Sequence, residues 1–85
     1  MFTVYSKAGC PFCDKFIEVC KLEKLTHVVY ELNEHFTKDQ FYNEFGEGST
    51  FPQVVLELTD NSLKLGGCKE SLKYMQEKNL CCQVQ

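Results

Sequence analysis

The feature that most constrains this chain is a strand–helix–strand unit at its start. Residues Phe2–Ser6 are apolar, aromatic or β-branched, and they predict a strand. Apolar spacing predicts a helix over Phe12–Lys24, with Phe12 on its inner face, and the β-rich segment Thr26–Leu32 predicts a second strand. Because a helix joins these strands within about 30 residues, we expect them to pair in parallel through a right-handed crossover.

The rest of the chain adds two helices and a hairpin. A capping box that starts at Thr37 predicts a second helix over about Lys38–Phe45. The segments Gln53–Leu58 and Leu63–Leu65 predict two strands joined by turn residues, and the last helix is expected over about Lys69–Lys78. The order β-α-β-α-β-β-α predicts an α/β fold: a four-stranded mixed sheet flanked by three helices, with helices on both faces.

Length and composition indicate a single small globular domain, residues 1–85, with a loosely held tail over 80–85. Seven Phe and four Tyr can build a modest core without disulfide staples. The net charge is −3 and the nine basic residues are all Lys, dispersed along the chain, so we expect no nucleic-acid partner. Since neither a signal peptide nor a membrane-spanning stretch is evident, we expect a cytoplasmic protein with no membrane association. A monomer is the expected working form.

Two cysteines mark the predicted start of the first helix. Cys10-Pro11-Phe12-Cys13 follows the first strand, and Pro11 suits the first helical position. The thiolate is the reactive form of cysteine, and a helix N-terminus favours it with unpaired N–H groups and partial positive charge. A residue three positions along lies on the same side of the helix, within reach for a disulfide. We therefore predict that Cys10, at the helix mouth and more exposed, is the nucleophile and that Cys13 resolves.

A helix terminus alone is too weak to activate the nucleophile fully. Lowering a thiol pKa from about 8.5 to about 5 needs about 5 kcal/mol of preference for the thiolate. A helix terminus supplies at most about 2 kcal/mol. The remainder must come from hydrogen bonds to the sulfur and from nearby cations, for which Lys7 is the local candidate.

The other cysteines are assigned to structure or to the tail rather than to catalysis, with a third redox thiol at Cys68 as the alternative. Six cysteines in a secreted chain would suggest a disulfide framework, whereas here they favour catalysis or metal binding. A structural zinc site with Cys81 and Cys82 is an alternative, but adjacent cysteines suit a tetrahedral site poorly. We expect Cys20 to pack in the core, Cys68 to be a small residue at the last helix start, and the Cys81-Cys82 pair to lack a catalytic role. No metal is expected.

The remaining notable side chains are assigned to structure. His27 and His35 flank the second strand and are expected to lie on the solvated surface. Four aromatic residues around the second helix are expected to pack in the core rather than form a binding surface: Phe36, Phe41, Tyr42 and Phe45.

Three motifs follow one another along the chain. Residues Lys7–Cys13 contain C-P-F-C, Thr50–Val54 contains T-F-P, and Gly66–Cys68 contains a Gly-Gly pair before the last helix. In this order the chain resembles the glutaredoxins over nearly its whole length. The resemblance implies a thioredoxin-like fold and glutathione-dependent thiol–disulfide oxidoreductase activity. It also implies that glutathione is a co-substrate and that no bound cofactor is required.

The resemblance further implies a glutathione site around the cysteine pair. The bond before Pro52 would be cis, and the Phe51 backbone would pair with the main chain of glutathione. Lys7 would contact a carboxylate, and the start of the last helix would bind the γ-glutamyl end. The residues assigned to glutathione in this way are Lys7, Phe12, Gln40, Phe51, Pro52, Gly67, Cys68, Lys69 and Glu70.

The motifs also depart from the family pattern. Lys69 and Glu70 stand where family members often carry Asp, so Glu70 is assigned to the γ-glutamyl amine and Lys69 to its carboxylate. Phe51 replaces the usual Val and Phe12 the commoner Tyr. These changes leave the chemistry intact and the substrate range open.

The expected partners are disulfide-containing or glutathionylated proteins, with ribonucleotide reductase suggested by family analogy. One alternative is a redoxin reduced by thioredoxin reductase, against which Lys7 and the Gly66-Gly67 pair argue. Another alternative is an iron–sulfur carrier, which Pro11 and Cys13 oppose.

Overall fold

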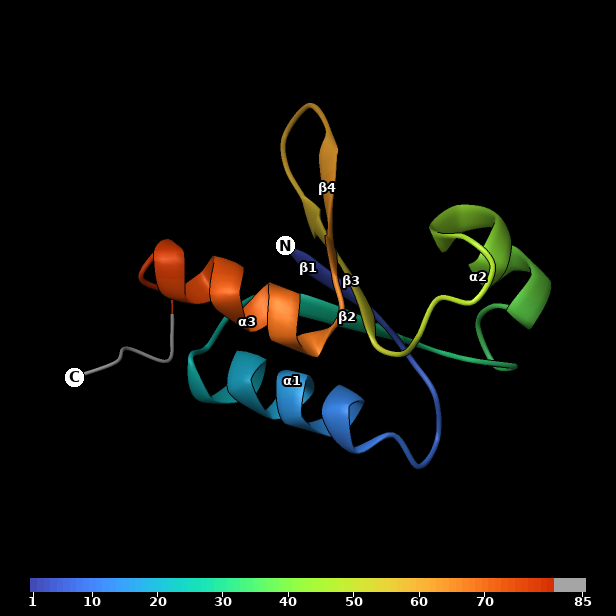
Figure 1. The fold of residues 1–85 in the computed structure, drawn as a ribbon. Coiled ribbons are helices and arrows are strands. Elements are labelled where there is room, and N and C mark those ends of the chain that lie inside the picture. Colours follow the sequence, from blue (N-terminus) through green and yellow to red (C-terminus); the bar gives the residue numbers. More distant parts are fainter. Residues whose placement is uncertain (81–85) are drawn as a thin grey trace.

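A computed structural model of the chain describes residues 1–80 (Figure 1). Four strands and three helices alternate in the predicted order, β-α-β-α-β-β-α. They are β1 (Phe2–Ser6), α1 (Pro11–Leu22), β2 (His27–Glu31), α2 (Lys38–Phe45), β3 (Gln53–Glu57), β4 (Ser62–Gly66) and α3 (Cys68–Glu77).

The four strands form one mixed sheet in the order β2-β1-β3-β4. The strands β1 and β2 are parallel, as a crossover through α1 requires, whereas β3 is antiparallel to both β1 and β4. Tyr5 pairs with Gln53, and Val54 pairs with Gly66. The C-terminal end of β1, the N-terminal end of β3 and the C-terminal end of β4 therefore lie together at the same end of the sheet.

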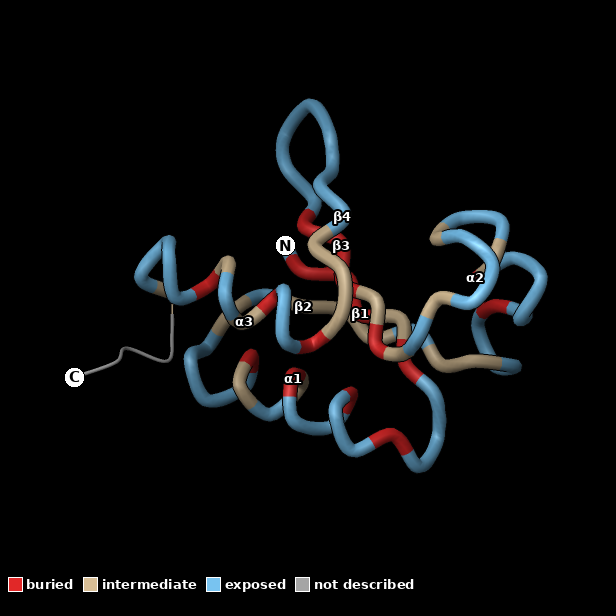
Figure 2. Tube along the Cα trace, viewed as in Figure 1, coloured by how far each residue is buried: buried red, intermediate tan, exposed pale blue. Residues whose placement is uncertain are grey.

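The main core lies on the sheet face covered by α1 and α3, which run side by side (Figure 1). The buried stretches in Figure 2 gather where these helices meet the sheet. Cys20 is fully buried in this core, as predicted. The buried cluster consists of Phe2, Val4, Phe16, Cys20, Val54, Leu56, Cys68 and Met75.

An aromatic cluster joins α2 to the opposite face of the sheet. Successive strand residues point to opposite faces, so Tyr5 turns away from the core that contains Val4. The Tyr5 ring meets the Phe45 ring of α2 with their centroids 5.0 Å apart. Phe36 and Phe41 are buried in this cluster, as predicted, while Tyr42 and Phe45 are half-buried. Helices therefore cover both faces, as expected.

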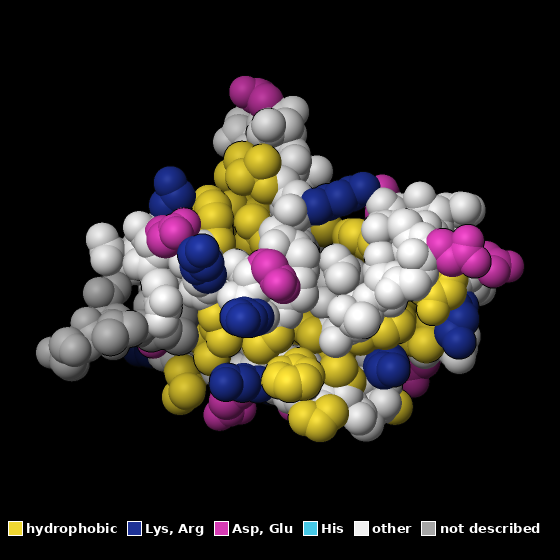
Figure 3. Space-filling model, in the orientation of Figure 1, with side chains coloured by type: hydrophobic (Ala, Val, Ile, Leu, Met, Phe, Trp, Pro, Cys, Tyr) yellow, Lys and Arg dark blue, Asp and Glu magenta, His cyan; other side chains and the backbone are white. Residues whose placement is uncertain are grey.

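The spacing of Phe12 predicts a place on the inner face of α1, but the residue is 62% exposed. Phe12 therefore does not lie on that face. Cys13 takes the inward position of the first turn and continues into Phe16 and Cys20. The Phe12 ring lies at the flank of the helix, beside Leu72 of α3. Figure 3 shows that hydrophobic side chains remain visible on this face of the molecule, over α1 and α3.

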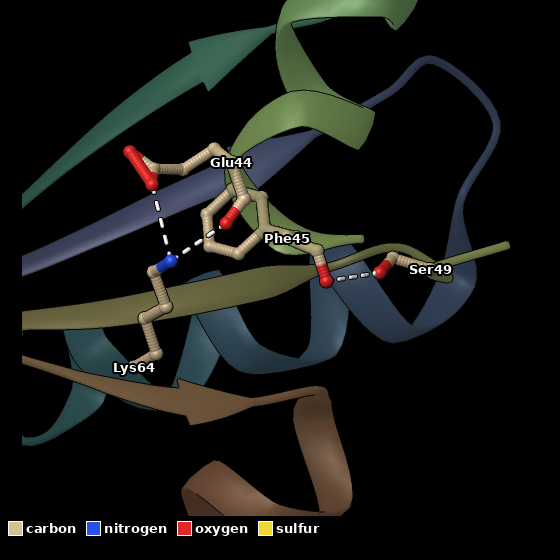
Figure 4. Close-up of polar contacts among 4 residues, drawn as sticks. All are labelled: Glu44, Phe45, Ser49 and Lys64. Atoms are coloured by element: carbon tan, nitrogen blue, oxygen red, sulfur yellow. Dashed lines mark hydrogen bonds and ion pairs between the residues drawn. The ribbon is translucent and has the colours of Figure 1, made fainter. Parts of the chain in front are cut away.

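Polar contacts fasten the end of α2 (Figure 4). The Lys64 ammonium on β4 donates to the Glu44 backbone carbonyl at 2.6 Å and pairs with the Glu44 carboxylate at 3.1 Å. The Ser49 hydroxyl donates to the Phe45 carbonyl at 2.8 Å. The carbonyls of Glu44 and Phe45, in the last turn of α2, thus both accept hydrogen bonds from side chains. Because an exposed ion pair contributes at most about 1 kcal/mol, aromatic packing is the main attachment of α2.

The helix ends follow the predicted capping chemistry. Pro11 is the first residue of α1, and the Thr37–Gln40 capping box is formed, with hydrogen bonds of 3.2 and 2.8 Å. Leu80 was expected to belong to a loosely held tail, but it packs against the core, and its N–H donates to the Met75 carbonyl at 2.8 Å. No helix within residues 1–80 is long and apolar enough to cross a lipid bilayer.

Candidate active site

Three loops meet where the strand ends converge. Cys10 follows β1, Pro52 precedes β3, and Gly67 follows β4. The Pro52 carbonyl oxygen is 3.6 Å from the position that a Cβ on Gly67 would occupy, so these two segments are in close contact. They border a hollow of about 250 Å³, lined by Phe12, Thr50, Phe51, Pro52, Gly67, Cys68, Lys69 and Glu70. Seven of these eight residues belong to the set that the resemblance implies.

Cys10 and Cys13 are joined by a disulfide, with their Cα atoms 5.2 Å apart. Cys10 is the N-cap of α1: its backbone is extended, and its sulfur accepts the Cys13 backbone N–H at 3.2 Å. The sulfur thus occupies the place that a Ser or Asp oxygen takes at other helix starts. An N–H group aimed at this atom favours negative charge on it, which is the direct hydrogen bond that the sequence argument required.

Cys10 is less exposed than a nucleophile at a helix mouth was expected to be. Its exposed fraction is 5%, against 0% for Cys13. The order is as predicted, but both residues are buried in this disulfide-bonded form. The side chain between them, Phe12, is the exposed one.

Lys7 lies near the Phe51 ring but does not line the hollow beside Pro52. Its ammonium is 5.3 Å from the ring centroid, and the ring is stacked on Phe41 at 4.1 Å with 10° between the planes. A second hollow of about 320 Å³ adjoins the first and is lined by Lys7, Leu32, Lys38, Tyr42, Ser49, Thr50 and Phe51. The sequence analysis missed Lys38, whose only sequence signal is its place directly after the predicted N-cap Thr37.

The turn before α3 brings bare backbone to the hollow. Gly66 has a φ of +98°, which residues with a side chain rarely adopt. Gly67 is the N-cap of α3, and its N–H donates to the Glu70 carboxylate at 3.0 Å. Glu70 thus caps the helix as well as lining the hollow, a structural role that the sequence analysis did not assign.

Gln40 lies apart from the other predicted site residues. Its side-chain carbonyl accepts the Thr37 backbone N–H in the capping box of α2. It lines a separate aromatic hollow with Tyr5 and Tyr30 and neither of the two hollows around Phe51. The structure therefore brings together Lys7 and the residues of the Pro52 loop and α3 start, but not Gln40.

The remaining thiols of the described chain are shielded. Burial raises the pKa of Cys20 to about 11. Burial, and to a smaller extent the Glu70 carboxylate, also raises the pKa of Cys68, while Lys15 acts in the opposite direction. Both are protonated at neutral pH. Cys81 and Cys82 lie outside the described residues.

The two histidines line neither of the two hollows around Phe51, in line with their expected place away from the cysteine motif. His35 is exposed, and its Nδ1 accepts the Glu31 backbone N–H at 2.9 Å, whereas His27 is half-buried with Nδ1 2.8 Å from the Leu25 carbonyl oxygen. Within residues 1–80, no three His, Cys, Asp or Glu side chains are grouped so that they could hold a metal ion.

The fold and the disulfide at the helix start define a thioredoxin-like domain with a Cys-x-x-Cys site. The model of the family described as Glutaredoxin matches residues 2–58 of the chain. Because this match covers more than half of its length, the chain belongs to the glutaredoxin family.

Two solved structures share the fold. Glutaredoxin 1 from Francisella tularensis, crystallised with cacodylate, is similar with a TM-score of 0.68 and 23% identity, covering 93% of this chain and 94% of that one. Leishmania TDR1, described as a trimeric glutathione transferase, is similar with a TM-score of 0.67 and 18% identity, covering 92% of this chain and 18% of that one. These likenesses concern the fold alone. No curated protein sequence matches the chain.

Proposed function

We propose that this chain is a glutathione-dependent thiol–disulfide oxidoreductase that reduces protein disulfides and glutathione mixed disulfides. Membership of the glutaredoxin family supports the general activity. The observation that carries the proposal is the Cys10–Cys13 disulfide at the start of α1, with the Cys13 N–H directed at the Cys10 sulfur. One sulfur is thereby held where negative charge is favoured, and its partner lies one turn behind it.

Protein disulfides would be reduced by a dithiol route. The Cys10 thiolate attacks one substrate sulfur, forming a mixed disulfide while the other substrate sulfur leaves with the electron pair and takes up a proton. The Cys13 thiolate then attacks the Cys10 sulfur and displaces the second substrate thiolate, which is also protonated. The substrate gains two electrons and two protons, and the Cys10–Cys13 disulfide is formed.

Glutathione would return the protein to its reduced state. A first glutathione thiolate attacks the Cys10 sulfur and releases Cys13. A second attacks the glutathione sulfur bound to Cys10, releasing Cys10 and forming glutathione disulfide. With a glutathionylated protein, Cys10 attacks the glutathione sulfur directly, so this monothiol route does not need Cys13.

The two hollows around Phe51 support a site for glutathione. Lys7 and Lys38 line one hollow and suit a carboxylate, while Lys69 and Glu70 line the other and suit the charged γ-glutamyl end. Phe51 lines both hollows, and its backbone is the proposed partner for the main chain of glutathione. Phe12, Pro52, Gly67 and Cys68 complete the proposed contacts. The position of Gln40 offers it no support as a contact.

The proposed partners are glutathione and proteins that carry disulfides or glutathionylated cysteines, ribonucleotide reductase among them. A reducing cytoplasm is the proposed location, and a monomer the proposed working form. No bound cofactor is part of this mechanism, since the electrons pass between sulfur atoms.

Cys13→Ser tests the two routes. We expect this variant to keep most of its activity on a glutathionylated peptide and to lose most of its activity on a protein disulfide. A coupled assay with glutathione, glutathione reductase and NADPH measures both rates. Full turnover of the protein disulfide by Cys13→Ser would refute the dithiol route.

The reductant can be tested on the wild-type protein. We expect glutathione with glutathione reductase to reduce the Cys10–Cys13 disulfide, and thioredoxin reductase with NADPH to leave it oxidised. Mass spectrometry after alkylation counts the free thiols in each mixture. Rapid reduction by thioredoxin reductase alone would favour the alternative redoxin class.

A further inference from the structure

A groove lies between α1 and α3. It begins at Phe12, between the two cysteines, and extends along both helices. It has a volume of about 570 Å³. Phe12, Cys68 and Lys69 line both this groove and the hollow beside Pro52, so the two spaces adjoin. Lys15 and Lys73 line only the groove, which therefore extends beyond the proposed glutathione contacts.

The groove is basic in a chain whose net charge is negative. Lys15, Lys69 and Lys73 line it and are exposed, and no Asp or Glu belongs to its lining. Within the described part of the chain, the one ion pair formed joins Lys64 to Glu44, so these three ammonium groups have no carboxylate partner. The groove thus presents three unpaired positive charges, although the whole chain carries −3.

The floor of the groove is apolar. Phe12 is 62% exposed, an unusual state for a phenylalanine in a small protein, and the half-buried Leu72 lines the same groove. Lys69, Leu72 and Lys73 recur at helical spacing on one side of α3, while Phe12 and Lys15 lie three apart on α1. In Figure 3, Lys side chains lie next to hydrophobic side chains over these two helices, with acidic side chains among them.

We propose that this groove docks the polypeptide that flanks a substrate disulfide, and that it selects segments combining acidic and apolar side chains. This inference rests on the proposed function, because the groove matters only if Cys10 attacks protein disulfides. Carboxylates would meet the unpaired lysines, and an apolar side chain would cover Phe12 and Leu72. Charge complementarity of this kind raises association rates and excludes segments of like charge.

Three synthetic peptides test the selection. Each has the same length and the same internal disulfide, and the flanking positions hold Glu and Leu, Ser and Leu, or Lys and Leu. The pre-reduced protein is mixed with each peptide without glutathione, and the second-order rate of peptide reduction is measured. We expect the acidic peptide to react about tenfold faster than the basic one at low salt, with the difference shrinking as salt screens the charges.

Two charge-matched variants locate the effect. Lys15→Gln with Lys73→Gln removes two lysines of the groove, whereas Lys21→Gln with Lys24→Gln removes two lysines that do not line it. We expect the first pair to slow reduction of the acidic peptide about fivefold and to leave the Ser peptide unchanged, while the second pair changes neither rate. Lys15→Glu with Lys73→Glu should reverse the preference in favour of the basic peptide.

Each outcome decides a separate point. Equal rates for the three peptides with wild-type protein would overturn the docking proposal and leave the proposed function standing. Equal losses in the two variants would also overturn it, because the effect would then come from net charge rather than from the groove. Failure of the reduced protein to reduce any peptide would instead overturn the proposed function itself.

Discussion

The first turns of α1 and α3 each contain a cysteine, but the two cysteines differ by one position relative to the N-cap. That one-residue difference gives the two thiols different hydrogen bonding. Both helices begin at the same edge of the sheet, and both have a cysteine within the first turn. Cys10 is the N-cap of α1, and its sulfur accepts a backbone N–H. Cys68 is one position further in: the N-cap of α3 is Gly67, and the Glu70 carboxylate accepts the Gly67 N–H.

The comparison teaches that a helix N-terminus does not by itself make a thiol reactive. An N-cap side chain can turn back to the free N–H groups of the first turn, so its sulfur receives a hydrogen bond. Cys68 has no such bond among its described contacts; it is buried, and a carboxylate lies near it, so its thiol pKa is raised. Position relative to the cap, rather than mere presence in the first turn, therefore distinguishes the two sulfurs.

Removing each sulfur in turn is the strongest test of this difference. We expect Cys10→Ser to lower both disulfide reductase activities by at least about a thousandfold, because the attacking atom is lost. Cys68→Ser should lower either rate by less than about tenfold, since its thiol is protonated at neutral pH and only lines the proposed glutathione hollow. Steady-state assays on a glutathionylated peptide and a protein disulfide give the rates. A loss of activity in Cys68→Ser as large as that in Cys10→Ser would contradict this distinction between the two sulfurs.

Cys20, in the last turn of α1, extends the comparison to a thiol whose pKa is shifted by burial alone. Burial raises its pKa from 9.0 to about 11, so between these pH values the unfolded thiol loses its proton while the folded thiol keeps it. The unfolded state then binds fewer protons, and the free energy of unfolding falls as pH rises, by at most about 1.4 kcal/mol per pH unit.

Urea denaturation under reducing conditions at several pH values measures this slope. The variant Cys20→Ala should be less stable at pH 7 by about 1 kcal/mol or more, because buried volume is lost. It should also show a smaller fall in stability from pH 9 to 11 than the wild type does. Tyr5, whose pKa is also raised by burial, is present in both proteins and cancels in the difference. Identical slopes would contradict the assignment to Cys20.

The smallest expected effect concerns the charges around Cys68. Glu70→Gln keeps an oxygen for the Gly67 N–H but removes the charge that raises the Cys68 pKa, so alkylation should become about twofold faster. Lys15→Gln removes the opposing charge and should slow alkylation by a similar factor. Iodoacetamide labelling in a Cys10→Ser, Cys13→Ser background, followed by peptide mass spectrometry, measures the rate. Shifts in the same direction for both variants would exclude a charge effect.

The element order and most helix starts could be predicted because their signals are local. Pro11 fits the first helical position whatever packs against the helix, and the Thr37 capping box is closed by residues within one turn. The parallel pairing of β1 and β2 followed from the helix that joins them. These features depend little on the rest of the fold.

The differences between the predicted and the observed arrangement concern side chains whose direction depends on packing between distant segments. Phe12 has the spacing of an inner-face residue, but Cys13 fills that position in the first turn. The assignment of Gln40 to glutathione stays a prediction, although its side-chain oxygen accepts the Thr37 N–H and it lines neither hollow around Phe51. Lys38 reaches the hollow of Lys7 only because the aromatic cluster holds α2 beside the Pro52 loop, which no local pattern reveals.

The Phe51 ring and the Gly66-Gly67 turn give the hollow beside Pro52 two unlike walls. One wall is a large ring stacked flat on Phe41, and the other is main chain without side chains. Peptide groups are the same in every polypeptide, so a wall of bare main chain can hold a guest in register without discriminating among sequences. The bare main chain therefore adds little selectivity of its own, and discrimination among guests is left to the side chains of the hollow, such as Lys69 and Glu70, and to surfaces that contact the guest further along its length.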